Sequence, residues 1–240
     1  GEEASLVHEF YSRTGCKVKL YDFPMKDSAQ SNLGERRVLR QMRIEDLLFR
    51  DSIKVNDEMA RSFYAGKTIL VTGGGGSIGS ELCRQIAKLS PARLIIFDIY
   101  ENNAYDIQME LREKYPRLNL VTLIGSVRDS RRVNQVFRKY RPEVVYHAAA
   151  HKHVPLMEDS PCESIKNNAI GTYKTAYAAM MNGCKRFVLI STDKAVNPTN
   201  IMGASKRLCE MVIQSFDSIV RSGDASKLPR LFTHHEDGMA

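Results

Sequence analysis

Glycines between residues 72 and 79 form the segment whose residue types and spacing most directly indicate chemistry. The run Thr72-Gly73-Gly74-Gly75-Gly76-Ser77-Ile78-Gly79 satisfies two spacings at once, GxGxxG and GxxGxxG. Glycine permits a tight turn and lets the backbone approach a pyrophosphate, and the helix that follows offers unpaired N–H groups and the positive end of its dipole. No GK[ST] follows at the spacing of a triphosphate-binding loop. The segment therefore predicts a dinucleotide site, with a purely structural glycine turn as the alternative.

An aspartate supports the dinucleotide interpretation. Asp98 stands 19 residues after Gly79, at the end of an apolar run, where a carboxylate can accept hydrogen bonds from a ribose diol. We therefore expect NAD rather than NADP, although an arginine nearby would still admit a 2′-phosphate. Later apolar runs are followed by small residues, on the adenine and nicotinamide sides of such a site. The cofactor contacts expected from these positions are Gly73, Gly76, Ser77, Ile78, Gly79, Asp98, Ser126, Val127, Ala148, Ala149 and Ala150.

The elements that must position these residues alternate from residue 67 onward. Apolar runs of strand length, typical of strands buried on both faces, are followed by amphipathic stretches. Strands are expected at residues 67–72, 93–98, 119–124, 143–147 and 186–191. Helices are expected at residues 77–89, 101–115, 129–140, 161–181 and 200–221. This alternation predicts an α/β fold, a doubly wound parallel sheet of the Rossmann type, which brings the candidate residues to one edge of the sheet.

Composition and charge exclude several classes of protein. The chain has 240 residues, of which 43% are hydrophobic and 26% charged, the balance of a globular protein rather than a disordered one. Its net charge of +7 comes from dispersed basic residues, so no nucleic-acid partner is expected. Its 5 cysteines are scattered without a CxxC pair, which predicts a reducing compartment. No metal is expected either, because His147, His151 and His153 suit no shared helix face.

Several longer motifs resemble the extended short-chain dehydrogenase/reductase family. More narrowly, they resemble its UDP-N-acetylglucosamine 4,6-dehydratases of the membrane-associated polysaccharide-biosynthesis type. The motifs are the glycine run, AAAHKHVPLME at residues 148–158, STDKA at 191–195 and NPTNIMGASK at 197–206. The resemblance covers residues 33–215 and implies that bound NAD takes a hydride from C4 of a hexose. The C4 ketone acidifies the C5 proton, loss of that proton expels the C6 hydroxyl as water, and the hydride returns to C6.

The resemblance also assigns roles to individual residues. Asp193 is expected to protonate the departing C6 hydroxyl, Lys194 to remove the C5 proton and Thr192 to hydrogen-bond the C4 oxygen. Taken alone, these three residues are better explained as a strand end with a capping hydroxyl and a surface ion pair. By resemblance, Lys152, His153 and Asn197 belong to the sugar site, and Asn168 and Lys206 to the cofactor site. For Asn168, an amide on a helix surface is the alternative.

A missing tyrosine is the main departure from the family pattern. Short-chain dehydrogenases carry YxxxK, whose tyrosinate removes the alcohol proton, but Met202 stands four residues before Lys206. A thioether cannot take a proton. One subgroup of the resembled dehydratases has methionine here, so Met202 and Lys206 are assigned to the catalytic set. We expect Lys206 to bond the nicotinamide ribose, and the C4 proton to leave through Thr192 and an ordered water to Asp193 or Lys206.

The two ends of the chain match the family less well. Residues 1–66 are expected to be a linker and the remnant of an upstream domain, 67–221 the NAD-binding catalytic core, and 222–240 a tail or a fragment of a largely absent substrate domain. The expected partners are a UDP-sugar and further copies of the chain in a homo-oligomer. Membrane contact is expected only through segments missing from this chain, with the full-length protein on the cytoplasmic side and anchored in the inner membrane. A nucleotide-sugar 4-epimerase and a catalytically silent nucleotide-binding module stay open as rivals.

Overall fold

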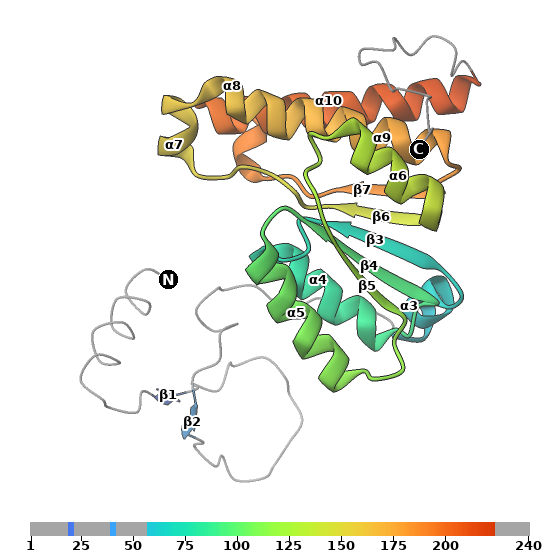
Figure 1. Cartoon of the computed structure of the whole chain (residues 1–240). Coiled ribbons are helices and arrows are strands. Elements are labelled where there is room, and N and C mark those ends of the chain that lie inside the picture. The colour runs from blue at the N-terminus through green and yellow to red at the C-terminus, as the bar shows by residue number, and fades with distance from the viewer. Residues whose placement is uncertain (1–18, 22–38, 42–56, 224–240) are drawn as a thin grey trace, which may run out of the picture. The chain divides into compact units, whose positions relative to one another are not determined.

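The computed structural model describes residues 19–21, 39–41 and 57–223 (Figure 1). The chain divides into two compact units, Gly1–Asn56 and Asp57–Ala240. In the first unit, β1 (Lys19–Tyr21) and β2 (Leu39–Gln41) pair as an antiparallel ribbon. Most of the segment expected to be a linker and domain remnant lies outside the described residues, and so do residues 224–240 of the expected tail.

Five parallel strands form the sheet of the second unit. They are β3 (Thr68–Thr72), β4 (Arg93–Asp98), β5 (Leu120–Ile124), β6 (Val144–His147) and β7 (Arg186–Leu189). Their order across the sheet is β5-β4-β3-β6-β7. The chain therefore winds outward from β3 to β5, returns to the other side of β3 and continues to β7, which confirms the doubly wound Rossmann-type prediction.

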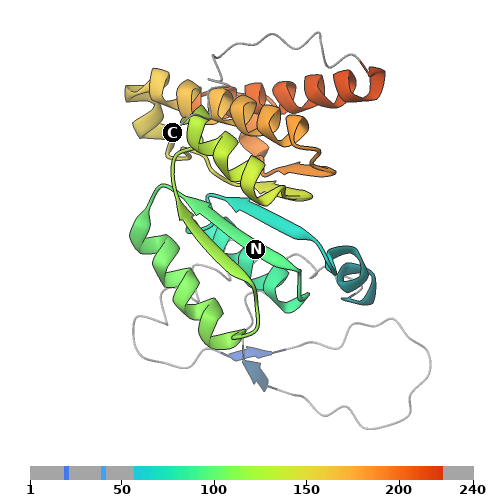
Figure 2. The same ribbon diagram turned by 45° about the vertical axis from the view of Figure 1, so that its right-hand side comes forward.

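Helices cover both faces of this sheet (Figures 1 and 2). On one face lie α4 (Ser77–Lys88) and α5 (Glu101–Lys114), and on the other α6 (Ser130–Tyr140), α9 (Gly171–Met181) and α10 (Ile201–Ser222). Because side chains alternate along a strand, β3 sends Ile69 and Val71 into the core under α4 and α5, and Leu70 into the core under α6 and α9. Burial on both faces explains why the strands are continuous apolar runs.

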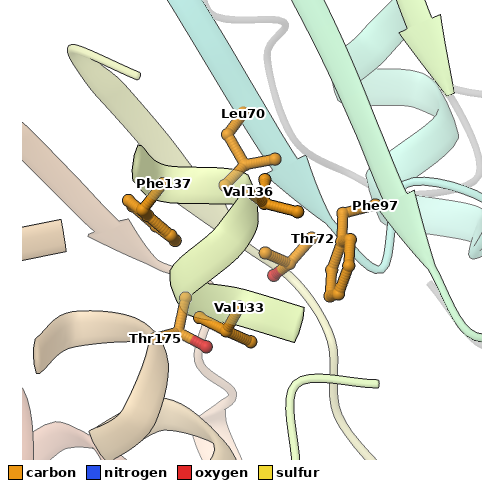
Figure 3. A pocket seen from close by; sticks show the side chains of 7 residues that line it. All are labelled: Leu70, Thr72, Phe97, Val133, Val136, Phe137 and Thr175. Atoms are coloured by element: carbon orange, nitrogen blue, oxygen red, sulfur yellow. The ribbon is translucent and has the colours of Figure 1, made fainter. Parts of the chain in front are cut away.

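The packing between the sheet and α6 leaves a narrow gap (Figure 3). It is lined by Leu70, Thr72, Phe97, Val133, Val136, Phe137 and Thr175. Apart from two threonine hydroxyls this lining is apolar. The gap encloses about 180 Å³ between atoms, but no part of it is wide enough to hold a water molecule. The gap is therefore part of the core and not a ligand site.

Residues 154–200 differ most from the expected elements. Instead of one helix from residue 161, the structure has α7 (Val154–Asp159), α8 (Pro161–Ser164), a π-helical turn η1 (Ile165–Ile170) and then α9. The last strand ends at Leu189 instead of residue 191, and a short 3₁₀ helix, η2 (Asp193–Ala195), follows it. Short 3₁₀ and π-helical turns carry no apolar periodicity of their own, so the sequence pattern cannot reveal them.

A further helix precedes the first strand of the sheet. The compact unit that contains the sheet begins at Asp57 and includes α3 (Asp57–Tyr64). Phe63 and Tyr64 of this helix pack against the core under α4 and α5. At the other end α10 closes at Gly223 with φ of 74°, a left-handed cap, within two residues of the predicted end.

Candidate functional site

The glycine turn between β3 and α4 is built so that two of its positions exclude any side chain. Gly73 has φ of +67°, and a Cβ there would lie 2.6 Å from the backbone nitrogen of Ala149. A Cβ on Gly79 would lie 2.0 Å from the carbonyl oxygen of Gly73. The turn therefore brings three stretches of backbone together, those at the ends of β3 and β6 and the first turn of α4. Gly76 is the N-cap residue of α4 and provides no side-chain cap, which leaves N–H groups of the first helical turn for a ligand.

Asp98 holds this turn against the neighbouring strand. Its carboxylate accepts hydrogen bonds from the backbone N–H of Gly75, at 2.8 Å, and of Tyr100, at 2.9 Å. The sequence pattern did not predict these bonds, because it assigned the carboxylate to a ribose only. A carboxylate can accept about four hydrogen bonds. Asp98 can therefore orient the turn and still accept from a ribose diol.

The loop after β5 is tied to the helices on the opposite side of the sheet edge. Val127 is buried against the start of α9, where a Cβ on Gly171 would lie 2.8 Å from its Cγ2. Arg128 pairs with Glu163 of α8 at 2.5 Å, and Lys174 of α9 donates to the Arg128 carbonyl at 2.5 Å. The Ser126 hydroxyl accepts from the Arg128 N–H at 3.1 Å. These bonds fix Ser126 and Val127 at the end of β5, where the adenine side of the site was expected.

Asn168 is buried and holds the backbone that follows β6. Its side chain is 0% exposed, accepts from the His151 N–H at 2.8 Å and donates to the His151 carbonyl at 3.0 Å. Its amide also donates to the Ser205 hydroxyl of α10 at 2.9 Å. The alternative of a helix-surface amide is therefore wrong. The same clasp leaves Lys152 and His153 exposed, at the edge where a sugar was expected.

The Thr192–Asp193–Lys194 segment is open to solvent. The Thr192 hydroxyl donates to Asp193 Oδ1 at 2.9 Å, and the Lys194 Nζ lies 3.6 Å from the same oxygen. The side chains of Asp193 and Lys194 are 87% and 51% exposed. The hydrogen bond from Thr192, followed by the charge of Lys194, lowers the pKa of Asp193. The segment therefore has the structure that its three residues suggest without the family resemblance: a strand end with a capping hydroxyl and a surface ion pair.

The first turn of α10 positions this segment. Asn200 caps the helix by accepting from the Gly203 N–H at 2.7 Å, and Glu158 of α7 accepts from the Ile201 N–H at 2.6 Å. A Cβ on Gly203 would lie 2.4 Å from the Lys194 carbonyl, so the helix backbone rests directly on the segment. Two motifs distant in sequence, those at 148–158 and 197–206, are thereby joined. Asn197 is exposed just before this turn.

Met202 and Lys206 lie one turn apart on α10 and are both buried. The Lys206 Nζ donates to the carbonyl of Ile190, two residues before Thr192, at 2.6 Å. Burial lowers the pKa of Lys206. The ammonium group thus lies just after the end of β7, close in sequence to the exposed Asp193–Lys194 pair.

Two further contacts at this edge were not predicted. Ser191 donates to Glu210 of α10 at 2.6 Å, which holds the residue before Thr192. His147 is buried between two threonines, and its spacing in the sequence carried no signal of this. Within residues 57–223, no three His, Cys, Asp or Glu side chains gather as a metal would require. None of the described helices has the length and apolar character of a membrane span.

Comparisons with known proteins show the family of this chain. The sequence model of the family described as "Polysaccharide biosynthesis protein" matches residues 69–229. The capsular polysaccharide biosynthesis protein CapD of Staphylococcus aureus is 46% identical over 201 residues, covering 83% of this chain and 34% of that protein. A UDP-N-acetylglucosamine 4,6-dehydratase (inverting) of Campylobacter jejuni (serotype O:23/36, strain 81-176) is 34% identical over 157 residues, covering 65% of this chain and 45% of that protein.

A solved structure shares the fold. The X-ray structure of Pen from Bacillus thuringiensis superimposes with a TM-score of 0.61 at 31% identity, over 68% of this chain and 48% of that one. The chain therefore spans less than half the length of each of these three proteins.

Proposed function

We propose that this chain, which belongs to the family of polysaccharide biosynthesis proteins, forms the NAD-binding and catalytic core of a nucleotide-sugar dehydratase. The proposed reaction is the 4,6-dehydration of UDP-N-acetylglucosamine to a 4-keto-6-deoxy sugar nucleotide, for surface polysaccharide or glycoprotein glycan synthesis. One observation carries the proposal: the Thr192–Lys194 segment and the glycine turn lie at the carboxyl ends of strands of one parallel sheet.

The residues of the glycine turn fit a dinucleotide. Backbone occupies the space that a Cβ on Gly73 or Gly79 would need, so both positions are restricted to glycine, and the first turn of α4 has no side-chain cap on its N–H groups. Gly76, Ser77 and Ile78 would meet the pyrophosphate there, and Asp98 the adenosine ribose. NAD bound there would supply the hydride-accepting chemistry for oxidation at C4 of the sugar and the hydride for reduction at C6.

Asp193 and Lys194 are proposed to carry the elimination. A general acid needs a pKa near the working pH, whereas the Asp193 pKa is lowered in the open state by Thr192 and Lys194. A sugar over the pair would bury the carboxyl and separate it from Lys194, and both changes raise its pKa. In the substrate complex Lys194 would first give up its ammonium proton, and the Asp193 carboxylate would take up a proton. Asp193 could then protonate the departing C6 hydroxyl, while the neutral amine of Lys194 takes the C5 proton.

Lys206 is proposed to replace part of the missing tyrosine. Met202 cannot accept the C4 proton, but it lies one helical turn from an ammonium with a lowered pKa. Lys206 would bond the nicotinamide ribose and favour proton loss nearby through its charge. The proton itself would leave through Thr192 and water to Asp193 while Lys206 is charged, or to Lys206 where that lysine is neutral.

Deuterated water tests the reaction in the complete protein. UDP-N-acetylglucosamine is incubated with purified protein, and the product is analysed by NMR and mass spectrometry. A dehydratase yields a 4-keto-6-deoxy product with deuterium at C5. A C4 epimer without deuterium would replace this proposal by an epimerase, and unchanged substrate would leave a silent nucleotide-binding module. Mass spectrometry of the released cofactor distinguishes NAD from NADP.

The remaining expectations stay predictions. They concern the sugar contacts of Lys152, His153 and Asn197, the homo-oligomer, the cytoplasmic location and the inner-membrane anchor of the full-length protein. Sedimentation of the complete protein and fractionation of cells test the last three.

A further inference from the structure

A buried histidine joins the two halves of the proposed site. His147 ends β6 and is 1% exposed. Its Nδ1 lies 2.7 Å from the hydroxyl of Thr72 at the end of β3, and its Nε2 lies 3.0 Å from the hydroxyl of Thr172 in α9. Both ring nitrogens are therefore engaged, on opposite sides of the ring, by side chains 75 and 25 residues away in the sequence.

The Nδ1 side leads to the glycine turn. Thr72 directly precedes Gly73, whose N–H donates to the Phe97 carbonyl at 2.8 Å. The Ala148 N–H, directly after His147, donates to the Thr72 carbonyl at 3.0 Å. The ring and the backbone thus tie the ends of β3 and β6 together where a Cβ on Gly73 would strike Ala149.

The Nε2 side leads to the catalytic residues. Thr172 also hydrogen-bonds the thiol of Cys209, three residues after Lys206 on α10. The His147 carbonyl accepts from the Ile190 N–H at 3.0 Å, and the Ile190 carbonyl accepts from Lys206 at 2.6 Å. Lys206 is therefore linked to His147 through both α10 and β7.

We propose that His147 is a positioning residue that sets the glycine turn through Nδ1 and Lys206 through Nε2, and so fixes the cofactor relative to the catalytic lysine. This inference rests on the proposed function. A neutral imidazole donates from one nitrogen and accepts at the other, so it can satisfy both threonine hydroxyls in a buried place. Losing either bond would leave one buried threonine hydroxyl without its partner and would loosen only the element on that side, the end of β3 or α9.

Replacing His147 by asparagine or by glutamine in the complete protein tests the Nδ1 bond and the Nε2 bond separately. The amide of His147→Asn reaches the position of Nδ1, and that of His147→Gln the position of Nε2. We expect His147→Asn to keep bound NAD within about twofold and to lower kcat roughly tenfold, and His147→Gln to weaken NAD retention roughly tenfold with kcat at saturating NAD near wild type. Thr172→Val and Thr72→Val, which keep side-chain volume and remove one hydroxyl each, should reproduce the two patterns in that order.

The outcomes separate this inference from the proposed function. A wild-type protein that binds NAD without forming the keto product refutes the dehydratase proposal, and NAD retention in the four variants then still tests the Nδ1 side. Wild-type protein that binds no dinucleotide overturns both. If His147→Asn and His147→Gln change NAD retention and kcat in equal proportion, or neither at all, then His147 contributes only general stability and the positioning role is wrong.

Discussion

The glycine turn and the Thr192–Lys194 segment lie at the same sheet edge, yet they are built in opposite ways. Backbone contacts leave no choice of side chain at Gly73 and Gly79, and the buried carboxylate of Asp98 fastens the turn. The Thr192–Lys194 segment, in contrast, is held from behind by α10, while its Asp193 carboxylate is 87% exposed. The proposed cofactor side is thus formed in advance, whereas the proposed acid and base are exposed to solvent.

This difference indicates where substrate binding must act. A preformed turn needs no rearrangement to accept a dinucleotide, so its binding energy is not spent on ordering the chain. The pKa of Asp193, however, is lowered, as in a solvated ion pair and not as in a general acid. Under the proposed function, bound substrate would therefore have to bury Asp193, which is exposed among the described residues. Four sets of variants and measurements test this contrast.

The largest expected effect is on the preformed side. Gly79→Ala drives a methyl group to 2.0 Å from the Gly73 carbonyl, so we expect loss of all bound dinucleotide. Gly76→Ala, whose Cβ would lie 3.3 Å from the same oxygen, needs only a small adjustment to fold and should still bind the cofactor poorly, because its methyl would stand at the start of α4, where the pyrophosphate is proposed to lie. Absorbance of the purified protein and mass spectrometry of the released nucleotide measure both. Full cofactor content in Gly79→Ala would show that the turn is not the binding site.

On the open side, Asp193→Asn and Lys194→Met should each lower the rate of dehydration about 10²–10⁴-fold. Because both side chains are exposed, cofactor content and melting temperature should stay at the wild-type values. Asp217→Asn is the matched control, since it breaks a comparably exposed ion pair with Arg221 on α10 and should leave the rate unchanged. An Asp193→Asn protein with the full rate of C5 deuterium incorporation would remove Asp193 from the mechanism.

His147, which links the two sides, makes the free energy of unfolding depend on pH. Burial first, and then the charge of Lys206, lowers the pKa of His147 to about 3. The unfolded chain protonates this histidine near pH 6.5, so between about pH 6.5 and 3 it binds more protons than the folded one, and stability falls as the pH falls. The slope should approach about 1.4 kcal/mol per pH unit. Urea titrations from pH 8 to 4.5 measure it, and His147→Gln should lack this part. Equal slopes in the two proteins would mean that His147 is not buried as a neutral ring.

The smallest effect concerns the support behind the open segment. Asn200→Ala removes the cap of α10 and should cost about 1 kcal/mol of unfolding free energy, with a several-fold lower rate because the same turn rests against Lys194. Cofactor content should not change. Asn200→Asp, which can accept from the Gly203 N–H in the same way, is expected to restore both quantities. A rate loss that persists in Asn200→Asp would point to a direct contact of the amide with the sugar instead.

Strands and most helices followed from local pattern. Burial on two faces and the alternation of element types predict a parallel sheet before any contact is known, and the strand limits agree within two residues. The single helix expected from residue 161 was wrong in detail, and α3 was not predicted. A π-helical turn and a preceding helix, α3, depend on packing partners such as His151 and the sheet core, which the local pattern does not contain.

By itself, the sequence determined the glycine turn, the strands that flank it and the chemical types of the candidate residues, because backbone freedom and apolar burial are properties of short segments. Only the tertiary structure decided that Asp98 holds the turn, that Asn168 is buried and that His147 connects Thr72 with Thr172. The reason is physical: a hydrogen bond between residues 75 positions apart forms only when the order of the strands in the sheet makes their two strands neighbours.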